Sequence, residues 1–97
     1  MAKGRLKTTR YDSAEYLRDE KDIAAYLDVA LEDGDPALVR HALNAIARAR
    51  GMTQIARDSG IARESLYKAL SENGNPEFAT VLKVVRALGL RLHARAA

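Results

Sequence analysis

Residues 51–71, GMTQIARDSGIARESLYKALS, constrain the fold of this chain more than any other stretch. Apolar side chains recur there at a spacing that gives two short helices one shared buried side. Gly60 falls between the two helices. Because glycine enters left-handed backbone space without a steric cost, the chain can turn sharply at this residue. The stretch therefore predicts a helix–turn–helix over about residues 53–71, with helices at about 53–59 and 62–71.

The segment before this motif carries repeated signals for the start and end of helices. Residues 12–15 have capping-box spacing and predict a short helix over 12–17. Asp19 can cap the next helix, and Gly34 would end it. Asp35-Pro36 combines a capping side chain with a proline at the first helical position, where its missing N–H costs nothing. The helix that follows is expected to end near Gly51.

The segment after the motif predicts one more helix. Asn73-Gly74 is a turn signal, and Asn75-Pro76 repeats the combination of cap and proline. A helix closed by Gly89 would then bury one apolar stripe, formed by Phe78, Val81, Leu82, Val85 and Leu88. The chain is thus expected to be all-α, with five to six helices.

The C-terminal segment, Leu90 to Ala94, alternates apolar and polar residues, which is strand periodicity. One isolated strand cannot satisfy its own backbone groups, so a strand here would pair with its copy in a second subunit. Val84 lies off the stripe of the preceding helix and would add apolar surface near this strand. A homodimer interface is therefore expected at Val84, Leu90 and Leu92. The alternative is a frayed end of the last helix.

Charge divides the chain into three blocks. Residues 1–10 carry four basic groups and no acid, residues 11–35 carry two basic and nine acidic groups, and residues 36–97 carry ten basic and four acidic groups. The first block has almost no apolar side chains and is expected to be a flexible basic arm. Residues 11–97 are expected to form a single domain. The predicted helix–turn–helix lies in the positive block, as phosphate binding requires.

Several function classes find no support in the sequence. Cysteine is absent, which excludes disulfides and thiolate chemistry. His41 and His93 lack companions at metal-ligand spacing, and the acids between Asp28 and Asp35 lack the pattern of a calcium loop. No catalytic motif, cofactor motif, signal peptide or membrane-length apolar run is present. We therefore expect a cytoplasmic protein that is not an enzyme and has no metal or cofactor.

The second helix of the predicted motif would present its start and outer face to the DNA major groove. Arg63 can offer a bidentate fork to guanine, and Glu64 can accept from cytosine or orient Arg63. The N-terminal amides of the first helix suit a phosphate, while arginines at 48, 50 and 57 flank the surface. The predicted DNA-binding residues are Thr53, Gln54, Arg57, Ala62, Arg63, Glu64, Ser65, Tyr67 and Lys68.

The segments YDSAEYL, GMTQIARDSG, RESLYKALS and LKVVRALGL resemble those of the probable addiction-module antidote proteins. The resemblance covers residues 11–92 and implies a lambda-repressor-like helix–turn–helix domain. It also implies a bacterial antitoxin that neutralises a RelE/ParE-like toxin encoded nearby and represses its own operon, usually as a dimer. One feature departs from the broader repressor pattern. The first short helix is about two residues shorter than usual, so Gln54 does not fall where those repressors place a phosphate-contacting glutamine.

The resemblance implies a basic toxin, and an acidic surface would complement it. Block 11–35 is the candidate surface, with tyrosine as an aromatic anchor. The predicted toxin-binding residues are Tyr16, Asp19, Glu20, Asp22, Tyr26, Asp28 and Glu32. The alternative for this block is a cap on the helical core. Two other functions also stay open, namely a stand-alone helix–turn–helix regulator without a toxin and a pure protein-interaction module.

Overall fold

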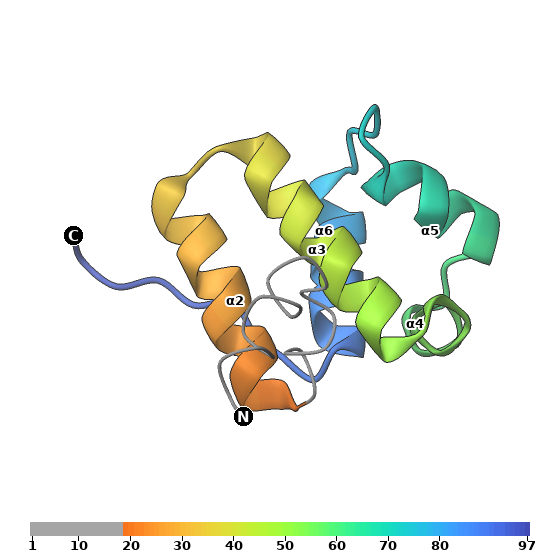
Figure 1. Cartoon of the computed structure of the whole chain (residues 1–97), viewed down its shortest axis with the longest axis horizontal. Helices are drawn as coiled ribbons and strands as arrows, with labels where there is room; N and C mark the ends of the chain where they lie inside the picture. Colours follow the sequence, from red (N-terminus) through yellow and green to blue (C-terminus); the bar gives the residue numbers. More distant parts are fainter. Residues whose placement is uncertain (1–18) are drawn as a thin grey trace, which may run out of the picture.

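Residues 19–97 are described by a computed structural model, and they form five helices (Figure 1). The helices are α2 (Glu20–Asp33), α3 (Pro36–Arg50), α4 (Met52–Ser59), α5 (Arg63–Leu70) and α6 (Phe78–Ala87). Within these residues no strand is formed, so the predicted all-α class is confirmed. The expected helix over 12–17 and the basic arm over 1–10 lie outside the described residues.

The first two helices begin and end where the sequence signals place them. The Asp19 carboxylate accepts a hydrogen bond from the backbone N–H of Asp22 at 2.9 Å, and so caps α2. Gly34 ends α2 in the left-handed conformation, with φ 83°. The Asp35 carboxylate accepts from the backbone N–H of Ala37 at 3.0 Å, and Pro36 opens α3 as predicted.

The turn between α4 and α5 also follows the prediction. Gly60 has φ 77°, and its N–H donates to the carbonyl of Ala56 at 3.0 Å. The hydroxyl of Ser59 accepts from the N–H of Ile61 at 3.2 Å, which satisfies a further backbone donor inside the turn. A residue with a Cβ atom would be strained at Gly60, so this glycine fixes the direction in which α5 leaves α4.

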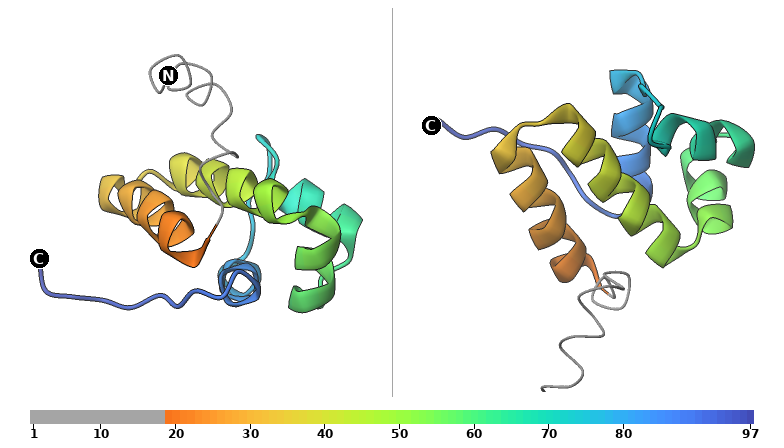
Figure 2. Two further views of the ribbon diagram at one scale, coloured as in Figure 1. Left: turned by 60° about the horizontal axis from the view of Figure 1, so that its bottom comes forward. Right: turned by 45° about the horizontal axis from the view of Figure 1, so that its top comes forward.

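The five helices share one buried core, with α3 at its centre. α3 packs against α2, α4 and α5, and α4 packs in turn against α6 (Figures 1 and 2). Ile23 from α2, Ile46 from α3, Ile55 from α4, Leu66 from α5 and Val84 from α6 are all 0–1% exposed. Because every helix contributes an apolar side chain to this cluster, α5 is held in a fixed orientation against α3 and α4.

The start of α6 differs from the prediction. The helix begins at Phe78 with Glu77 as its N-cap, and Asn75-Pro76 lies in the connection before it. Gly74, in the predicted turn, packs so closely on the last turn of α5 that a Cβ atom would lie under 3.0 Å from backbone atoms there. The chain then runs extended away from this contact through Glu77, which has ψ 154°. The local cap signal is therefore overridden by the close approach of the connection to α5.

The apolar stripe of α6 is also rotated from its predicted position. Val84, Val85 and Leu88 face the core, whereas the side chains of Phe78 and Leu82 are 69% and 39% exposed. Val84 has 0% exposure within one chain. The expectation that Val84 adds apolar surface at a dimer interface is therefore wrong, because the packing of α6 on α4 buries it.

The tail after α6 is irregular in the single chain, and its pairing with a second copy stays a prediction. The N–H of Leu90 donates to the carbonyl of Val85 at 3.1 Å, and residues 91–97 then run in an irregular, extended course past α2 (Figure 2). Leu90 and Leu92 are half-buried and pack against the core. The predicted strand is absent from the described part of this single chain, because no other segment of residues 19–97 lies beside the tail as a ladder partner.

Candidate nucleic-acid interface

The outer face of α5 collects most of the residues predicted to read DNA. Leu66 and Leu70 point into the core with 0% and 1% exposure, and so fix which side of α5 faces outward. Every polar residue predicted for this helix is then exposed, namely Arg63, Glu64, Ser65, Tyr67 and Lys68. Ala62, the N-cap residue of α5, is exposed as well. The helix therefore offers a continuous polar surface at its start and along its outer side.

Arg63 is held by Tyr67, one helical turn further on. The guanidinium carbon lies 5.5 Å from the centre of the Tyr67 ring, and one guanidinium nitrogen donates to the Tyr67 hydroxyl at 3.4 Å. The stacking restricts the guanidinium while leaving other donors of its fork open. Glu64 was expected as a possible orienting group for Arg63, but within residues 19–97 the partner that fixes Arg63 is Tyr67.

The first helix of the motif carries a chain of polar contacts along its exposed side. The Gln54 side-chain amide donates to the Asp58 carboxylate at 2.9 Å, and its carbonyl oxygen accepts from Arg57 at 3.4 Å. Thr53 is exposed, and the first intrahelical bond of this turn runs from the N–H of Ile55 to Gly51 at 3.1 Å. Gln54 is therefore engaged with its own helix, whereas Thr53 is exposed at the N-terminal end of α4, where the first backbone amides have no partner within the helix.

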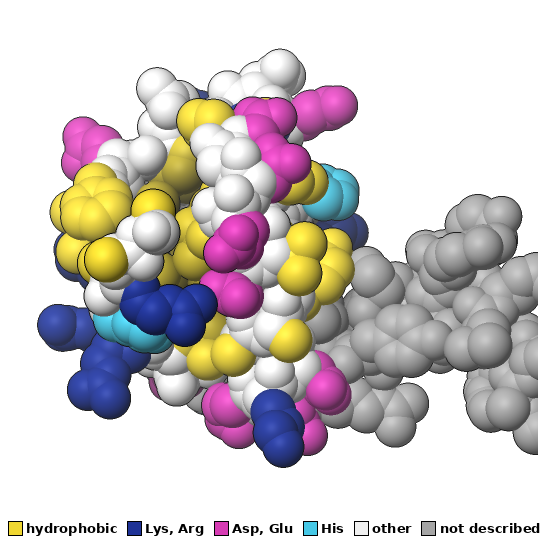
Figure 3. Space-filling model, turned by 90° about the vertical axis from the view of Figure 1, so that its left-hand side faces the viewer, with side chains coloured by type: hydrophobic (Ala, Val, Ile, Leu, Met, Phe, Trp, Pro, Cys, Tyr) yellow, Lys and Arg dark blue, Asp and Glu magenta, His cyan; other side chains and the backbone are white. Residues whose placement is uncertain are grey.

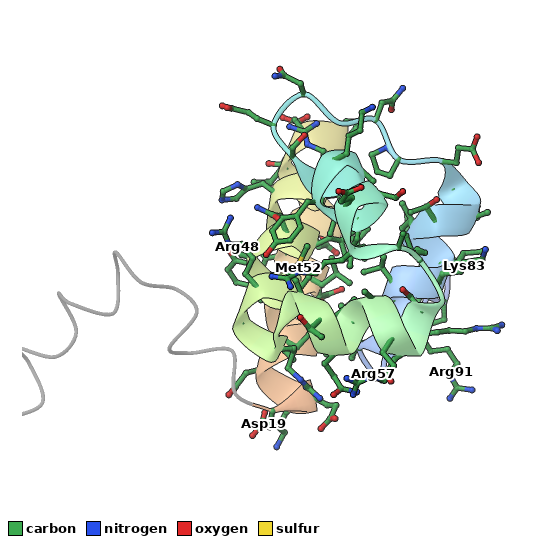
Figure 4. The ribbon with its side chains drawn as sticks, turned by 90° about the vertical axis from the view of Figure 1, so that its right-hand side faces the viewer. Asp19, Arg48, Met52, Arg57, Lys83 and Arg91 are labelled. Atoms are coloured by element: carbon green, nitrogen blue, oxygen red, sulfur yellow. The ribbon has the colours of Figure 1, made fainter. Side chains whose placement is uncertain are left out.

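Basic side chains surround the helix–turn–helix on several sides. In Figure 4, Arg48 lies to one side of the two helices, Lys83 to the other and Arg57 below α4. Arg50, which the sequence placed among the flanking arginines, forms an ion pair with Glu20 of α2 at 3.6 Å. Lys83 was missed because it belongs to α6, outside the motif. Its exposed position on a helix that packs against α4 is the signal that could have found it.

The acidic residues predicted to contact a toxin are only partly free, unlike the exposed polar residues of α5. Asp19 caps α2 and Glu20 pairs with Arg50, so two of them stabilise local structure. Asp22, Asp28 and Glu32 are exposed, and Tyr26 is half-buried against the core. Figure 3 shows acidic side chains in a row down this face of the molecule. Tyr16 lies outside the described residues.

A groove lies beside this acidic row. Its volume is about 650 Å³, and it runs between α2 and the tail. Ala24, Asp28 and Glu32 line the side formed by α2, and residues 90–95 line the other side. Within residues 19–97 no three potential metal-ligating side chains come together. Neither is any helix of this part of the chain long and apolar enough to cross a bilayer.

The fold and this surface define a small helical protein built around a helix–turn–helix with an exposed polar second helix. Residues 7–96 match the family model described as "Probable addiction module antidote protein", so the chain belongs to that family. An uncharacterised protein of Haemophilus influenzae is 56% identical over 81 residues, which cover 84% of each chain. No solved structure gives a significant match.

Proposed function

We propose that this antidote binds double-stranded operator DNA through α5, represses its own operon and neutralises a small basic toxin encoded beside it. The proposal places the protein in the bacterial cytoplasm, as a homodimer with no enzymatic activity. Membership of the antidote family supports the toxin partner in general terms. The surface of α5 is the single observation that supports DNA binding.

The argument for DNA binding starts from how α5 is held. Its two leucines fix it in the core, and its outer side carries Arg63, Ser65, Tyr67 and Lys68 in exposed positions. A helix presented in this way fits the major groove, where arginine reads the O6 and N7 atoms of guanine. Arg48, Arg57 and Lys83 lie around it at positions suited to phosphates.

The DNA-binding proposal is tested by titrating the protein into labelled promoter DNA of its own operon. Fluorescence anisotropy measures the affinity at several salt concentrations. We expect affinity to fall steeply as salt rises, because each neutralised phosphate releases counterions. Arg63→Ala should cost roughly 1–3 kcal/mol on the promoter and much less on random DNA. Arg95→Ala, which removes the same charge from the tail, is the matched control. Equal losses on both DNAs would make Arg63 only a phosphate contact.

We assign the toxin-binding surface to the exposed acidic residues of α2. Asp22, Asp28 and Glu32 are accessible on one helix, and Tyr26, one turn after Asp22, is half-buried and could serve as an anchor beside Asp22. A basic toxin would be attracted to this face. The same helix supplies Ile23 and Leu27 to the core, so the test must keep α2 intact rather than delete it.

Co-expression with the neighbouring gene product and affinity capture test this second part. We expect the double variant Asp22→Asn/Glu32→Gln to capture less toxin and to lose neutralisation in a growth assay. The variant Glu72→Gln/Glu77→Gln neutralises two exposed acids elsewhere and should behave as the parent protein. Equal capture by both variants would remove the toxin site from α2. Capture of no toxin by the parent protein would favour a stand-alone regulator.

A pure interaction module is a further alternative. It has the same fold but predicts no promoter binding at any salt concentration. The titration described above therefore separates it from the repressor.

A further inference from the structure

The end of α5 is closed by a tight turn over residues 71–74. The hydroxyl of Ser71 donates to the carbonyl of Lys68 at 2.8 Å, and the N–H of Gly74 donates to the carbonyl of Ser71 at 2.8 Å. Gly74 packs on the last turn of α5, where a Cβ atom would collide with the carbonyl groups of Lys68 and Ala69. The 71–74 turn is therefore folded against the end of α5 that carries Lys68, one of the exposed residues of the candidate DNA surface.

Arg40 of α3 holds this turn from the core side. Its terminal nitrogen Nη1 donates to the carbonyl of Gly74 at 3.4 Å, and the two residues are 34 positions apart. Every other side-chain hydrogen bond within residues 19–97 joins residues at most 4 positions apart. Because hydrogen bonds are directional, α3 constrains the end of α5 by more than apolar packing.

The buried part of the Arg40 guanidinium opposes folding. Its Nε atom is buried, and no acceptor among residues 19–97 reaches it. An N–H group that leaves water without gaining an acceptor costs free energy. A methionine would fill the space of the aliphatic stem without this cost. What the guanidinium adds to the described structure is therefore its contact with Gly74 rather than a net gain in stability.

We propose that Arg40 is a positioning residue for DNA recognition, which sets the orientation of α5 in the major groove by holding Gly74. The inference rests on the proposed function and deepens it, since Arg40 reads no base itself. Leu66 and Leu70 attach α5 to the core, but apolar contacts are non-directional and do not fix its tilt alone. Recognition groups must be held to within about 0.5 Å, so a released turn would misplace the side chains of α5.

Arg40→Met tests this role, because methionine keeps an unbranched apolar side chain and removes every donor. We expect the ratio of affinities for promoter and random DNA to fall roughly threefold to tenfold, less than for loss of a direct base contact. Affinity for random DNA and its salt dependence should stay the same, since a positioning residue neutralises no phosphate. Arg40→Lys restores a donor and should recover most of the ratio. Arg95→Met, which removes the same charge from the tail, is the matched control.

Gly74→Ala tests whether Arg40 acts through the 71–74 turn. The added methyl group collides with carbonyl groups of α5, so the turn must shift and the ratio should fall here too. In Arg40→Met/Gly74→Ala the two losses should not add, because either change releases the same contact. Circular dichroism and urea denaturation check that each variant keeps its helices. Arg40→Met should lose little stability, since the unpaired Nε–H is removed together with the bond to Gly74.

Amide hydrogen exchange without DNA gives an independent measurement of the turn. In Arg40→Met the N–H of Gly74 should exchange roughly threefold or more faster than in the parent protein, because the turn opens more often. The N–H of Leu66, which donates to Ala62 at the start of α5, should keep its rate. This comparison remains informative if Gly74→Ala fails to fold.

Four results would overturn the inference. They are an unchanged affinity ratio in Arg40→Met, an equal loss on both DNAs that makes Arg40 a phosphate contact, additive losses in the double variant, and unchanged exchange at Gly74. The two proposals fail separately. A parent protein that binds no promoter refutes the repressor itself, whereas a promoter-binding protein whose ratio is insensitive to Arg40 refutes the inference alone.

Discussion

The helices α5 and α2 carry opposite charge patterns, and they make their charged groups available in different ways. On α5 the buried positions are leucines, and all five predicted polar side chains are exposed. On α2 two of the predicted acids are used locally, since Asp19 caps the helix and Glu20 pairs with Arg50. Charge counted along a sequence therefore overstates the free acidic surface of α2 but describes α5 well.

The difference has a structural cause. α5 is entered through a glycine turn, and its N-cap residue, Ala62, makes no side-chain hydrogen bond. No polar side chain is therefore used as a cap at the start of α5. The first turn of α2 is capped by the Asp19 carboxylate, so one acidic side chain of this segment is engaged in stabilising the helix. We infer that α5 is the better defined of the two candidate surfaces and that the free acidic surface of α2, where the toxin site is proposed, begins at Asp22.

The largest effect is expected from the leucine that orients α5. Leu66→Ala should lower the free energy of unfolding by about 2–5 kcal/mol, because it leaves a cavity under a helix of eight residues. Leu31→Ala on α2 removes a leucine that is 42% exposed, and it should cost about 1 kcal/mol or less. Urea denaturation followed by circular dichroism measures both. Equal losses would contradict the conclusion that the buried Leu66, unlike the half-exposed Leu31, is an important anchor of its helix.

Much of this arrangement was predictable from the sequence because its signals are local. Asp19, Gly34 and Gly60 mark helix ends through their own side chains or backbone freedom, and each acts at its predicted place. The errors concern features set by distant contacts. The approach of Gly74 to α5 displaces the start of α6, and the packing of α6 on α4 buries Val84 while exposing Phe78. One sequence carries no direct record of such contacts.

The candidate DNA-binding surface shows the same division between features set by local sequence and features set by distant contacts. The spacing of four residues between Arg63 and Tyr67 is visible in the sequence, but the stacking of the two groups needs their rotamers. Lys83 joins the surface only because α6 packs beside α4. The groove beside α2 depends on the course of the tail, which the alternating pattern alone did not determine.

The next largest effect is expected when the planar guanidinium of Arg63 on α5 is replaced by an ammonium group of the same charge. Arg63→Lys keeps the charge but loses the planar fork and its stacking on Tyr67. We expect discrimination between the promoter and random DNA to fall by roughly 1–3 kcal/mol, while the salt dependence changes little. Parallel anisotropy titrations on the two DNAs measure it. Lys68→Arg, an exposed position later in the same helix, is the control, and it should leave discrimination nearly unchanged. Unaltered discrimination in Arg63→Lys would assign base reading to another residue.

A smaller effect separates the structural from the binding role of Asp19 on α2. Asp19→Ala should destabilise the fold by about 1 kcal/mol, since the bond to the Asp22 N–H is lost. Asp19→Asn should keep most of that stability, because asparagine is also a good cap. Thermal unfolding measures stability, and toxin capture is measured on the same samples. If Asp19→Asn is stable but captures less toxin, the charge of Asp19 contributes to binding and the free acidic surface extends to the start of α2.

The smallest effect is expected at the ion pair that joins α2 to α3. Glu20→Gln should lower the free energy of unfolding by only a few tenths of a kcal/mol, because the Glu20 side chain is 60% exposed and water screens the 3.6 Å contact with Arg50. Urea denaturation at low and high salt measures the loss, which should shrink as salt rises. Glu32→Gln removes an exposed acid of the same helix that is not in this pair, and it serves as the control. A salt-insensitive loss of more than about 1 kcal/mol would mean that the pair is an important link between α2 and α3. In that case Glu20, like Asp19, would belong to the structure of α2 rather than to its free surface.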